Sequence, residues 1–367
     1  MRLLLTGGGT GGHLFPAIAT AQEFQRQYPG TEVLFVGTNR KVDTKSLSAY
    51  GFSSKTITCH GVKGKNVFQL LKAVATLPLA CIQSLQIIWQ FKPDIILGVG
   101  GYVTGPVVAA GKSQGVPSVI HEQNSIPGLA NRKLGKLANR VCLSLPGSEG
   151  GFDPEKIVYT GNPVRKKILK LAENNKESIS DKKCILVLGG SQGAHAINGL
   201  VPEALAGLEE KEQESLSVIH QTGAKDASIV REAYSNTKID AQVEPFFSEM
   251  HEIYKRADFL VSRAGATTLS EIAVLGKPAI LIPYPYAADN HQEKNGQYYV
   301  EGGGAFQFLE KELTPKILQS TIQGMLQNKE EFSRMASSMK KLAFPDAPER
   351  IVECCMELIG KGSQDNV

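Results

Sequence analysis

The chain has 367 residues, more than the roughly 250–300 residues at which a single hydrophobic core stops growing, so we expect two domains. Its composition of 42% hydrophobic and 21% charged residues with 37 glycines excludes a largely disordered chain and is typical of a globular α/β protein. The net charge of +4 is too small to indicate nucleic-acid binding, but it suits an anionic substrate or an anionic membrane surface.

The first part of the chain alternates short apolar runs with longer helical stretches. We predict strands at residues 2–6, 33–36, 95–98, 117–120, 141–145 and 157–159. Because parallel neighbours need a crossover rather than a hairpin, this alternation predicts a parallel sheet covered by helices. Glycine and proline interrupt the pattern in Gly161-Asn-Pro-Val-Arg165, so we expect the first domain to be residues 1–163.

One segment of this domain is uncharged over residues 73–89, but its proline and polar residues argue against a membrane-spanning helix. An apolar helical face is predicted from residues at three- or four-residue steps: Phe68, Leu71, Ala75, Leu79, Ile82 and Trp89. Two interpretations stay open. The segment packs on the sheet as a crossover helix, or about Lys63–Ile82 rests on the membrane, with its lysines near anionic headgroups.

The second part of the chain repeats the alternation. We predict strands at residues 184–188, 216–220, 239–243, 258–261, 279–282 and 305–307, in a second domain of residues 164–344. A helix at about 345–360 follows, and we expect it to pack back on the first domain. Residues 360–367 are polar and are expected to be disordered.

The two halves share an internal repeat. The segment Gly7-Gly-Gly-Thr-Gly-Gly-His13 is matched by Gly189-Gly-Ser-Gln-Gly-Ala-His195, and a second pair of strand-end segments, near residues 94–101 and 258–265, follows in the same order. Two matches in one order indicate a duplicated βαβ domain. We therefore predict an α/β fold of two Rossmann-like domains facing a cleft, because open parallel sheets bind ligands beyond the carboxyl ends of their strands.

Each glycine-rich turn joins a strand to a helix, where free N–H groups and the helix N-terminus favour phosphate. The spacing Gly7-x-Gly9-x-x-Gly12 also fits a dinucleotide-binding fingerprint, but no acidic residue follows the second strand at 33–36, which disfavours a nicotinamide cofactor. A P-loop is excluded because His13 stands where Lys-Ser or Lys-Thr is required. The chain has no Asp-x-Asp pair to hold a cation against a pyrophosphate, so we expect neither a metal nor a cofactor.

With these motifs the sequence resembles the MurG family of N-acetylglucosaminyltransferases of peptidoglycan synthesis. The glycine turns, Gly100-Gly-Tyr102, His121-Glu-Gln-Asn124, Gly161-Asn-Pro-Val-Arg165 and Gly265-Ala-Thr-Thr-Leu-Ser-Glu271 stand in the family's order and span essentially the whole chain. The resemblance implies a GT-B type fold. The donor UDP-N-acetylglucosamine binds mainly the C-terminal half, and the acceptor, undecaprenyl-pyrophosphoryl-MurNAc-pentapeptide (lipid I), binds the N-terminal half.

The resemblance also implies residue roles. Glu271 contacts the ribose, Ser191 the diphosphate, and Asn124 and Gln292 the N-acetylglucosamine. The remaining expected substrate contacts are Thr10, Gly11, Gly12, Arg165, Gln192, Phe247, Ala266, Thr267, Thr268, Leu269 and Ser270. Phe247 replaces a small aliphatic residue at the uracil, which is harmless if the contact is made by the backbone.

Three residues are candidates for the reacting centre. His13 follows a strand-end turn, and an imidazole suits a base at neutral pH, although it could instead orient phosphate. Glu122 is an alternative base or a positioning group, and Tyr102 could line the acceptor site or simply pack. His195 is interpreted as structural.

The implied activity is that of an inverting, metal-independent transferase at the cytoplasmic face of the inner membrane, bound peripherally and without nucleic acid. The cysteines lack metal-ligand spacing and the N-terminus lacks a signal sequence, which favours the cytoplasm. The rival interpretations are a nucleotide-sugar epimerase, a transferase with another acceptor, and a non-catalytic scaffold that senses nucleotide-sugar.

Overall fold

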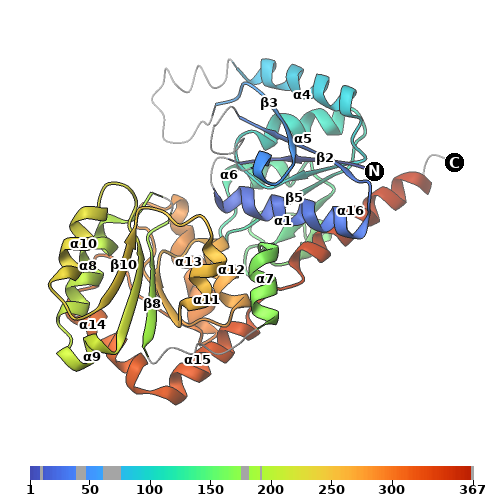
Figure 1. The fold of residues 1–367 in the computed structure, drawn as a ribbon. Helices are drawn as coiled ribbons and strands as arrows, with labels where there is room; N and C mark the ends of the chain where they lie inside the picture. Colours follow the sequence, from blue (N-terminus) through green and yellow to red (C-terminus); the bar gives the residue numbers. More distant parts are fainter. Residues whose placement is uncertain (9–10, 39–46, 61–75, 175–181, 191, 365–367) are drawn as a thin grey trace. The chain divides into compact units, whose positions relative to one another are not determined.

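The computed structural model describes residues 1–8, 11–38, 47–60, 76–174, 182–190 and 192–364. The chain forms two compact units, one of Met1–Arg165 with Phe344–Val367 and one of Lys166–Ala343 (Figure 1). The first unit thus takes in Arg165, two residues beyond the boundary expected from the sequence.

The first unit is built on a seven-stranded parallel sheet in the order β3-β2-β1-β4-β5-β6-β7. Its strands are β1 (Arg2–Thr6), β2 (Glu32–Gly37), β3 (Ser53–Thr56), β4 (Ile95–Gly98), β5 (Ser118–Glu122), β6 (Arg140–Leu143) and β7 (Ile157–Tyr159). The six strands predicted for this unit are confirmed. β3 was not predicted because its residues Ser-Ser-Lys-Thr are exposed at the sheet edge and give no apolar signal.

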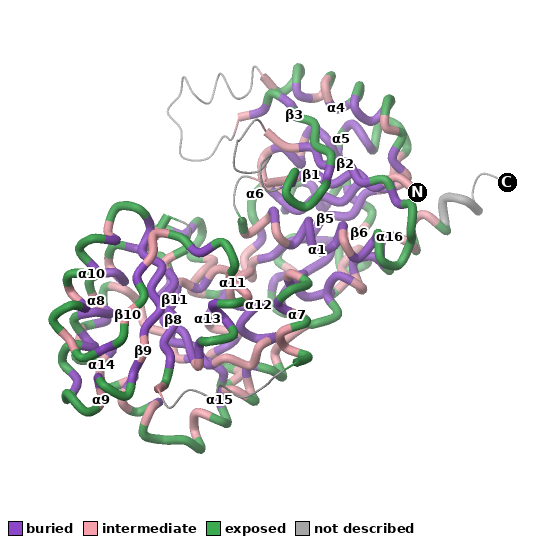
Figure 2. The backbone as a smooth tube through the Cα atoms, in the orientation of Figure 1, coloured by how far each residue is buried: buried purple, intermediate pink, exposed green. Residues whose placement is uncertain are grey.

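Helices cover both faces of this sheet. They are α1 (Gly11–Gln27), α4 (Leu77–Phe91), α5 (Thr104–Ser113), the short α6 (Leu129–Leu134), the 3-10 turn η1 (Pro154–Lys156) and the C-terminal α16 (Ala347–Gln364). Leu3 and Leu5 of β1 pack with α1 and α16, whereas Leu4 packs with α4 and α5, because alternate residues of a strand face opposite ways. Figure 2 shows the resulting buried sheet between more exposed helices.

The C-terminal helix differs from its prediction at its end. α16 continues to Gln364, so the expectation of disorder from residue 360 is wrong for residues 360–364, and residues 365–367 lie outside the described part. The helix packs along α1 and places Ile351, Val352 and Cys355 in the core of the first unit. This buried stripe is what returns the chain to the first unit.

The second unit has a six-stranded parallel sheet in the order β10-β9-β8-β11-β12-β13. Its strands are β8 (Lys183–Leu188), β9 (Leu216–Gln221), β10 (Asp240–Glu244), β11 (Phe259–Ser262), β12 (Ala279–Leu281) and β13 (Ala305–Gln307). All six were predicted. Its helices are α7 (Lys166–Glu173), α8 (His195–Ala206), α9 (Glu210–Glu214), α10 (Ala227–Ser235), α11 (Met250–Arg256), α12 (Ala266–Val274), η2 (Ala288–Asn290), α13 (His291–Glu301), α14 (Pro315–Gln327) and α15 (Lys329–Lys341).

The two strand orders confirm the repeat seen in the sequence. β1 and β8, which precede the two glycine turns, both lie third in their sheets. β1 pairs with β2 on one side and β4 on the other, and β8 pairs in the same way with β9 and β11. The first sheet differs by one additional edge strand, β7. Each unit is therefore a doubly wound parallel sheet in which the carboxyl ends of the strands share one edge.

Each sheet also contains a fully buried histidine. His121 of β5 and His220 of β9 are both fully buried, and burial lowers the pKa of His121 to about 4 and that of His220 to about 3. Both rings are therefore neutral at neutral pH, whereas in an unfolded chain a histidine has a pKa near about 6.5.

We expect these two rings to make the protein less stable as the pH is lowered. A histidine whose pKa is lower in the folded than in the unfolded chain stabilises the fold fully above about pH 6.5. This stability is lost as the pH falls towards about 4, because the unfolded chain binds the proton first. At about pH 5 the loss should be roughly 2 kcal/mol for each histidine. Denaturant midpoints of unfolding, measured between about pH 7.5 and pH 5, check this expectation. In His220→Asn, the midpoint of the second unit should change less over this pH range than in the wild type. Midpoints that do not change over this range would contradict it.

Candidate active site

In the first unit, predicted site residues gather where β1, β4 and β5 end. Because these strands are neighbours in the sheet, the glycine turn after β1, the loop after β4 and the residues after β5 lie side by side. His13 lies in the first turn of α1, directly after the glycine turn. Its Nδ1 is 2.9 Å from Oε1 of Gln123, which follows the last residue of β5.

The ring of His13 lies against Gly100 in the loop after β4. A Cβ at that position would meet Cε1 of His13 at 3.1 Å, and the φ of Gly100 is +99°, which side chains disfavour. A glycine is therefore required here both for its backbone conformation and for the close approach of the imidazole.

Gln123 and His121 form a buried hydrogen-bond network behind His13. Gln123 Nε2 donates to the carbonyl oxygen of Val99 over 2.9 Å and to Nδ1 of His121 over 3.0 Å. His121 Nε2 in turn lies 3.1 Å from the carbonyl oxygen of Gly161 and 3.0 Å from the hydroxyl oxygen of Ser144. The carbonyl can only accept, so this nitrogen carries the proton and the hydroxyl oxygen is a second acceptor. The lowered pKa of His121 agrees with a neutral ring that accepts at Nδ1.

Glu122 is buried, and both of its carboxylate oxygens are occupied by its own loop. Oε1 accepts from the backbone N–H and the side-chain amide of Asn124, and Oε2 accepts from the N–H of Gly128 and the amide of Asn131 over 2.9 Å. These bonds fix the loop between β5 and α6. The geometry therefore favours the positioning role for Glu122 over the role of base.

The other predicted residues of this unit are less closely connected to His13. Tyr102 packs its ring against the core between the sheet and α4 and α5. Gly11 and Gly12 begin α1, whereas Thr10 lies outside the described residues. Arg165 stacks its guanidinium over the ring of Phe15 of α1 at 4.7 Å.

In the second unit the turn after β8 is held by a glutamine at the end of β9. Gln221 donates to the carbonyl oxygen of Gly190 over 3.2 Å and accepts from the N–H of Phe247 over 3.0 Å. Gly193 approaches the backbone of Thr222 so closely that a Cβ there would clash with its carbonyl oxygen. Of the predicted substrate contacts in this turn, Gln192 is exposed, and Ser191, the predicted diphosphate contact, lies outside the described residues.

The side chain of Phe247 is buried, and the neighbouring Phe246 is exposed. The phenyl ring of Phe247 therefore belongs to the core of the second unit. A contact with uracil at this position would therefore be made by the backbone, the case in which the replacement by phenylalanine is harmless.

The predicted nucleotide contacts at residues 266–271 form the start of α12. Gly265 is the N-cap of this helix, and the positive end of the helix dipole in its first turn, at Ala266, Thr267 and Thr268, suits an anion. Leu269 is fully buried and its N–H donates to the carbonyl oxygen of Gly265, so its side chain does not face a ligand. Ser270 donates its hydroxyl to the carbonyl oxygen of Ala266.

Glu271 is almost completely buried on α12. Its Oε2 accepts a hydrogen bond of 3.0 Å from the hydroxyl of Tyr254, a residue of α11. A carboxylate held in one orientation by a buried tyrosine is suited to recognising a pair of hydroxyl groups.

Gln292 and Arg263 hold the loop after β12. Gln292 Oε1 accepts from the N–H of Tyr284, and Arg263 donates to the carbonyl oxygens of Ile282 and Pro283 and pairs with Glu310 over 2.6 Å. A depression of about 400 Å³ lies at this loop and is lined by Tyr284, Tyr286, Asn290, Glu293 and Lys311 with neighbouring residues.

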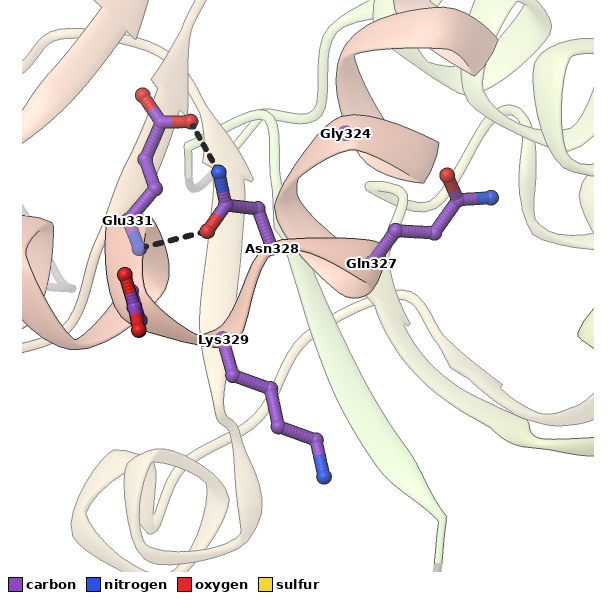
Figure 3. Close-up of a pocket in the computed structure, with 6 residues that line it drawn as sticks. Gly324, Gln327, Asn328, Lys329 and Glu331 are labelled. Carbon is purple, nitrogen blue, oxygen red and sulfur yellow. Dashed lines mark hydrogen bonds between the residues drawn. The ribbon is translucent and has the colours of Figure 1, made fainter.

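A second depression, of about 630 Å³, lies at the corner between α14 and α15 and contains none of the predicted site residues (Figure 3). Its central residue, Asn328, caps α15: the Oδ1 atom accepts from the N–H of Glu331 over 3.0 Å, and the amide faces the carboxylate of the same residue. These contacts stabilise a helix end, and the feature is structural.

Several residues that organise the site were not predicted, namely Gln123, Gln221, Tyr254 and Arg263. Each acts by linking segments that are distant in the sequence, as Gln123 links residues 13, 99 and 121. The sequence signal for Gln123 was its place inside the motif His121-Glu-Gln-Asn124, and the other three had none.

Comparison with known proteins agrees with this geometry. The glycosyltransferase family 28 N-terminal domain matches residues 3–143, and the glycosyltransferase family 28 C-terminal domain matches residues 184–351. The chain therefore belongs to glycosyltransferase family 28.

Particular relatives are similar over their whole length. A protein of Desulfotalea psychrophila, 54% identical over 98% of this chain and 97% of its own, is named UDP-N-acetylglucosamine–N-acetylmuramyl-(pentapeptide) pyrophosphoryl-undecaprenol N-acetylglucosamine transferase. A protein of Geotalea daltonii with the same name is 42% identical over 98% of each chain.

Solved structures give the same picture. The crystal structure of Acinetobacter baumannii MurG matches with a TM-score of 0.76 at 30% identity and covers 97% of this chain and 99% of that one. The UDP-GlcNAc 2-epimerase of Neisseria meningitidis bound to UDP-GlcNAc has a TM-score of 0.69 at 15% identity over 97% and 100% of the two chains, which shows a shared fold.

The hydrogen bonds of Glu122 give a test of its role. In Glu122→Gln an amide N–H₂ would face N–H donors at one of the two oxygen positions, and we expect a loss of roughly 1–3 kcal/mol of unfolding free energy. Denaturant unfolding measures it, with Glu155→Gln, an exposed carboxylate of the same unit, as the control. A Glu122→Gln protein of normal stability whose kcat is lost would instead support the role of base.

Proposed function

We propose that this chain transfers N-acetylglucosamine from UDP-N-acetylglucosamine to the 4-hydroxyl of undecaprenyl-pyrophosphoryl-MurNAc-pentapeptide, with inversion at the anomeric carbon. The products are UDP and the lipid-linked disaccharide known as lipid II, an intermediate of peptidoglycan synthesis. The observation that carries the proposal is 54% identity over nearly the whole chain to a relative named for this reaction. The match spans both units, so it includes both sets of strand-end loops.

The donor is assigned to the second unit. The positive end of the helix dipole at the start of α12 and the glycine turn after β8 suit the diphosphate, and the carboxylate of Glu271, oriented by Tyr254, suits the ribose hydroxyls. When the bond from the anomeric carbon to UDP breaks, the developing charge would be stabilised by this helix dipole and the glycine turn.

The acceptor is assigned to the first unit, with His13 as the base. In one displacement the acceptor oxygen bonds to the anomeric carbon as its proton passes to His13 and UDP leaves. The imidazole is suited to this because it follows the glycine turn at the sheet edge and is held by Gln123.

The acceptor is lipid-linked, and α4 supports a peripheral contact with the cytoplasmic face of the membrane. Along this uncharged helix an exposed row of apolar side chains, the α4 stripe, consists of Leu79, Ile82, Leu85 and Trp89. Trp89 is 71% exposed, so the stripe extends beyond the expected range of about Lys63–Ile82. Residues 63–75 of that range lie outside the described part. In the described residues, no helix combines the length and apolarity needed to cross a bilayer.

The opposite face of α4 is buried, as expected if the segment packs on its domain as a crossover helix. Ala80, Ser84, Ile87 and Ile88 are buried, and α4 packs on α5. One helix can therefore serve both purposes, because its buried face anchors it to the unit while the α4 stripe is available to lipid.

The proposed reaction is tested by radiolabel transfer from UDP-N-acetylglucosamine to a short-chain analogue of the lipid acceptor. We expect acceptor-dependent formation of the disaccharide and, for His13→Ala, a kcat lower by about 10²–10⁴ with UDP affinity little changed, since a base acts in the transition state.

Other outcomes of this assay would point elsewhere. Epimerised nucleotide-sugar without acceptor would identify an epimerase, and binding of UDP-N-acetylglucosamine without any turnover would identify a sensor. A His13→Ala variant that keeps more than about a tenth of kcat would exclude His13 as the essential base.

The membrane contact is tested with vesicles that contain anionic phospholipid. Replacing Ile82 and Trp89 of the α4 stripe by serine should weaken co-sedimentation at least about tenfold, because it removes the two most exposed apolar side chains of the stripe. Activity on a water-soluble acceptor should be unchanged. Ile229→Ser, which removes an exposed isoleucine of α10, is the matched control. Equal vesicle binding by the double variant and the wild type would contradict the proposal.

A further inference from the structure

We propose that Gln123 is a positioning residue that keeps the proton of neutral His13 on Nδ1, so that Nε2 is the atom that receives the acceptor proton. The inference rests on the proposed function and deepens it: it names the basic atom and the residue that selects it. A histidine has two neutral tautomers, and its second nitrogen can act as a base in only one of them.

The orientation of the Gln123 amide is set by a group that cannot change its role. A main-chain carbonyl oxygen only accepts, so the end of the amide that lies 2.9 Å from the carbonyl oxygen of Val99 must be the N–H₂ group. Its second N–H points to Nδ1 of His121 at 3.0 Å.

His121 is fixed in the same way from its other side. Nε2 of its ring faces both the carbonyl oxygen of Gly161 and the hydroxyl of Ser144. The hydroxyl can donate or accept but the carbonyl can only accept, so the proton is on Nε2 and Nδ1 is an acceptor. Turning the Gln123 amide over would bring its oxygen against two acceptors, the carbonyl of Val99 and this nitrogen. Because all these groups are buried, that arrangement would leave unsatisfied polar atoms at a cost of about 1–3 kcal/mol each.

With both N–H groups used, the oxygen of Gln123 is what remains for His13. It lies 2.9 Å from Nδ1 of His13 and can only accept, so this nitrogen is the donor. In the neutral ring the lone pair is then on Nε2, which has no partner among the residues that the structure describes.

The choice of an amide partner also matters. The repeat histidine of the second unit, His195, places its Nδ1 3.0 Å from the carboxylate of Asp226. A carboxylate attracts the imidazolium form, whereas the neutral amide of Gln123 orients the ring without adding a negative charge. The ring of His13 is therefore oriented by a partner that carries no charge.

The first test reads the tautomer directly. In the full-length protein labelled with ¹⁵N-histidine, the ring nitrogen shifts of His13, assigned by their loss in His13→Ala, should show Nδ1 protonated and Nε2 unprotonated above the titration of the ring. In Gln123→Met the ring should move towards the Nε2–H tautomer, which free imidazole side chains favour. Gln123→Glu keeps an acceptor oxygen opposite Nδ1 of His13 and should retain Nδ1–H, at a cost in stability because its second oxygen replaces the N–H₂ group that bonds the carbonyl of Val99 and His121.

The second test measures the effect on the reaction. Gln123→Met should lower kcat roughly 10- to 100-fold, as for other side chains that orient a histidine, with UDP affinity unchanged. Gln213→Met is the matched control: Gln213 is a buried glutamine of the second unit whose amide also makes hydrogen bonds to two backbone carbonyls and one N–H. Gln213→Met should lose a comparable amount of unfolding free energy, but its kcat should equal that of the wild type.

The outcomes separate this inference from the proposed function. An Nε2–H tautomer in the wild type, or no change of tautomer in Gln123→Met, would overturn the inference whatever reaction the protein catalyses, because this measurement needs no substrate. A shift of tautomer with unchanged kcat would overturn the positioning role. Absence of sugar transfer in the wild type, with the Nδ1–H tautomer present, would overturn the proposed function and leave the assignment of the tautomer intact.

Discussion

The carboxyl ends of parallel strands meet at one edge of a sheet, and every other feature of the site depends on this constraint. In the first unit it brings the turn after β1, the loop after β4 and the residues after β5 together, so His13, Gly100 and Gln123 become neighbours. In the second unit the same constraint joins the turn after β8 to Gln221 at the end of β9. Catalytic and binding groups are supplied by loops, and the rigid sheet sets their distances.

The two units preserve one scaffold and differ in the partner of the repeated histidine. His13 and His195 occupy equivalent places after glycine turns, but the first contacts an amide and the second a carboxylate. Asp226 is itself held by Asn198, and these hydrogen bonds with Asn198 and His195 lower its pKa. Duplication therefore supplied the backbone geometry, while substitutions around each ring set its chemistry.

Buried polar groups are tolerated in this fold because they form closed networks. Around β5, the carboxylate of Glu122, the amide of Gln123 and the ring of His121 each find partners in backbone groups of adjacent loops. Such a network gives each of its members a single orientation, since any reversal leaves a buried acceptor opposite another acceptor. Precision at His13 thus comes from residues that need not contact substrate at all.

The sequence by itself determined the two-domain parallel fold, the repeat and the identity of most loops that form the site. It did so because strand periodicity, glycine turns and the motif around His121 are local signals. It did not predict β3, whose exposed polar residues carry no pattern, or the last turn of α16. Only the tertiary structure decided the partners of Gln123, Glu122 and Glu271, because those hydrogen bonds join segments far apart in the chain and depend on how the strands are ordered in each sheet.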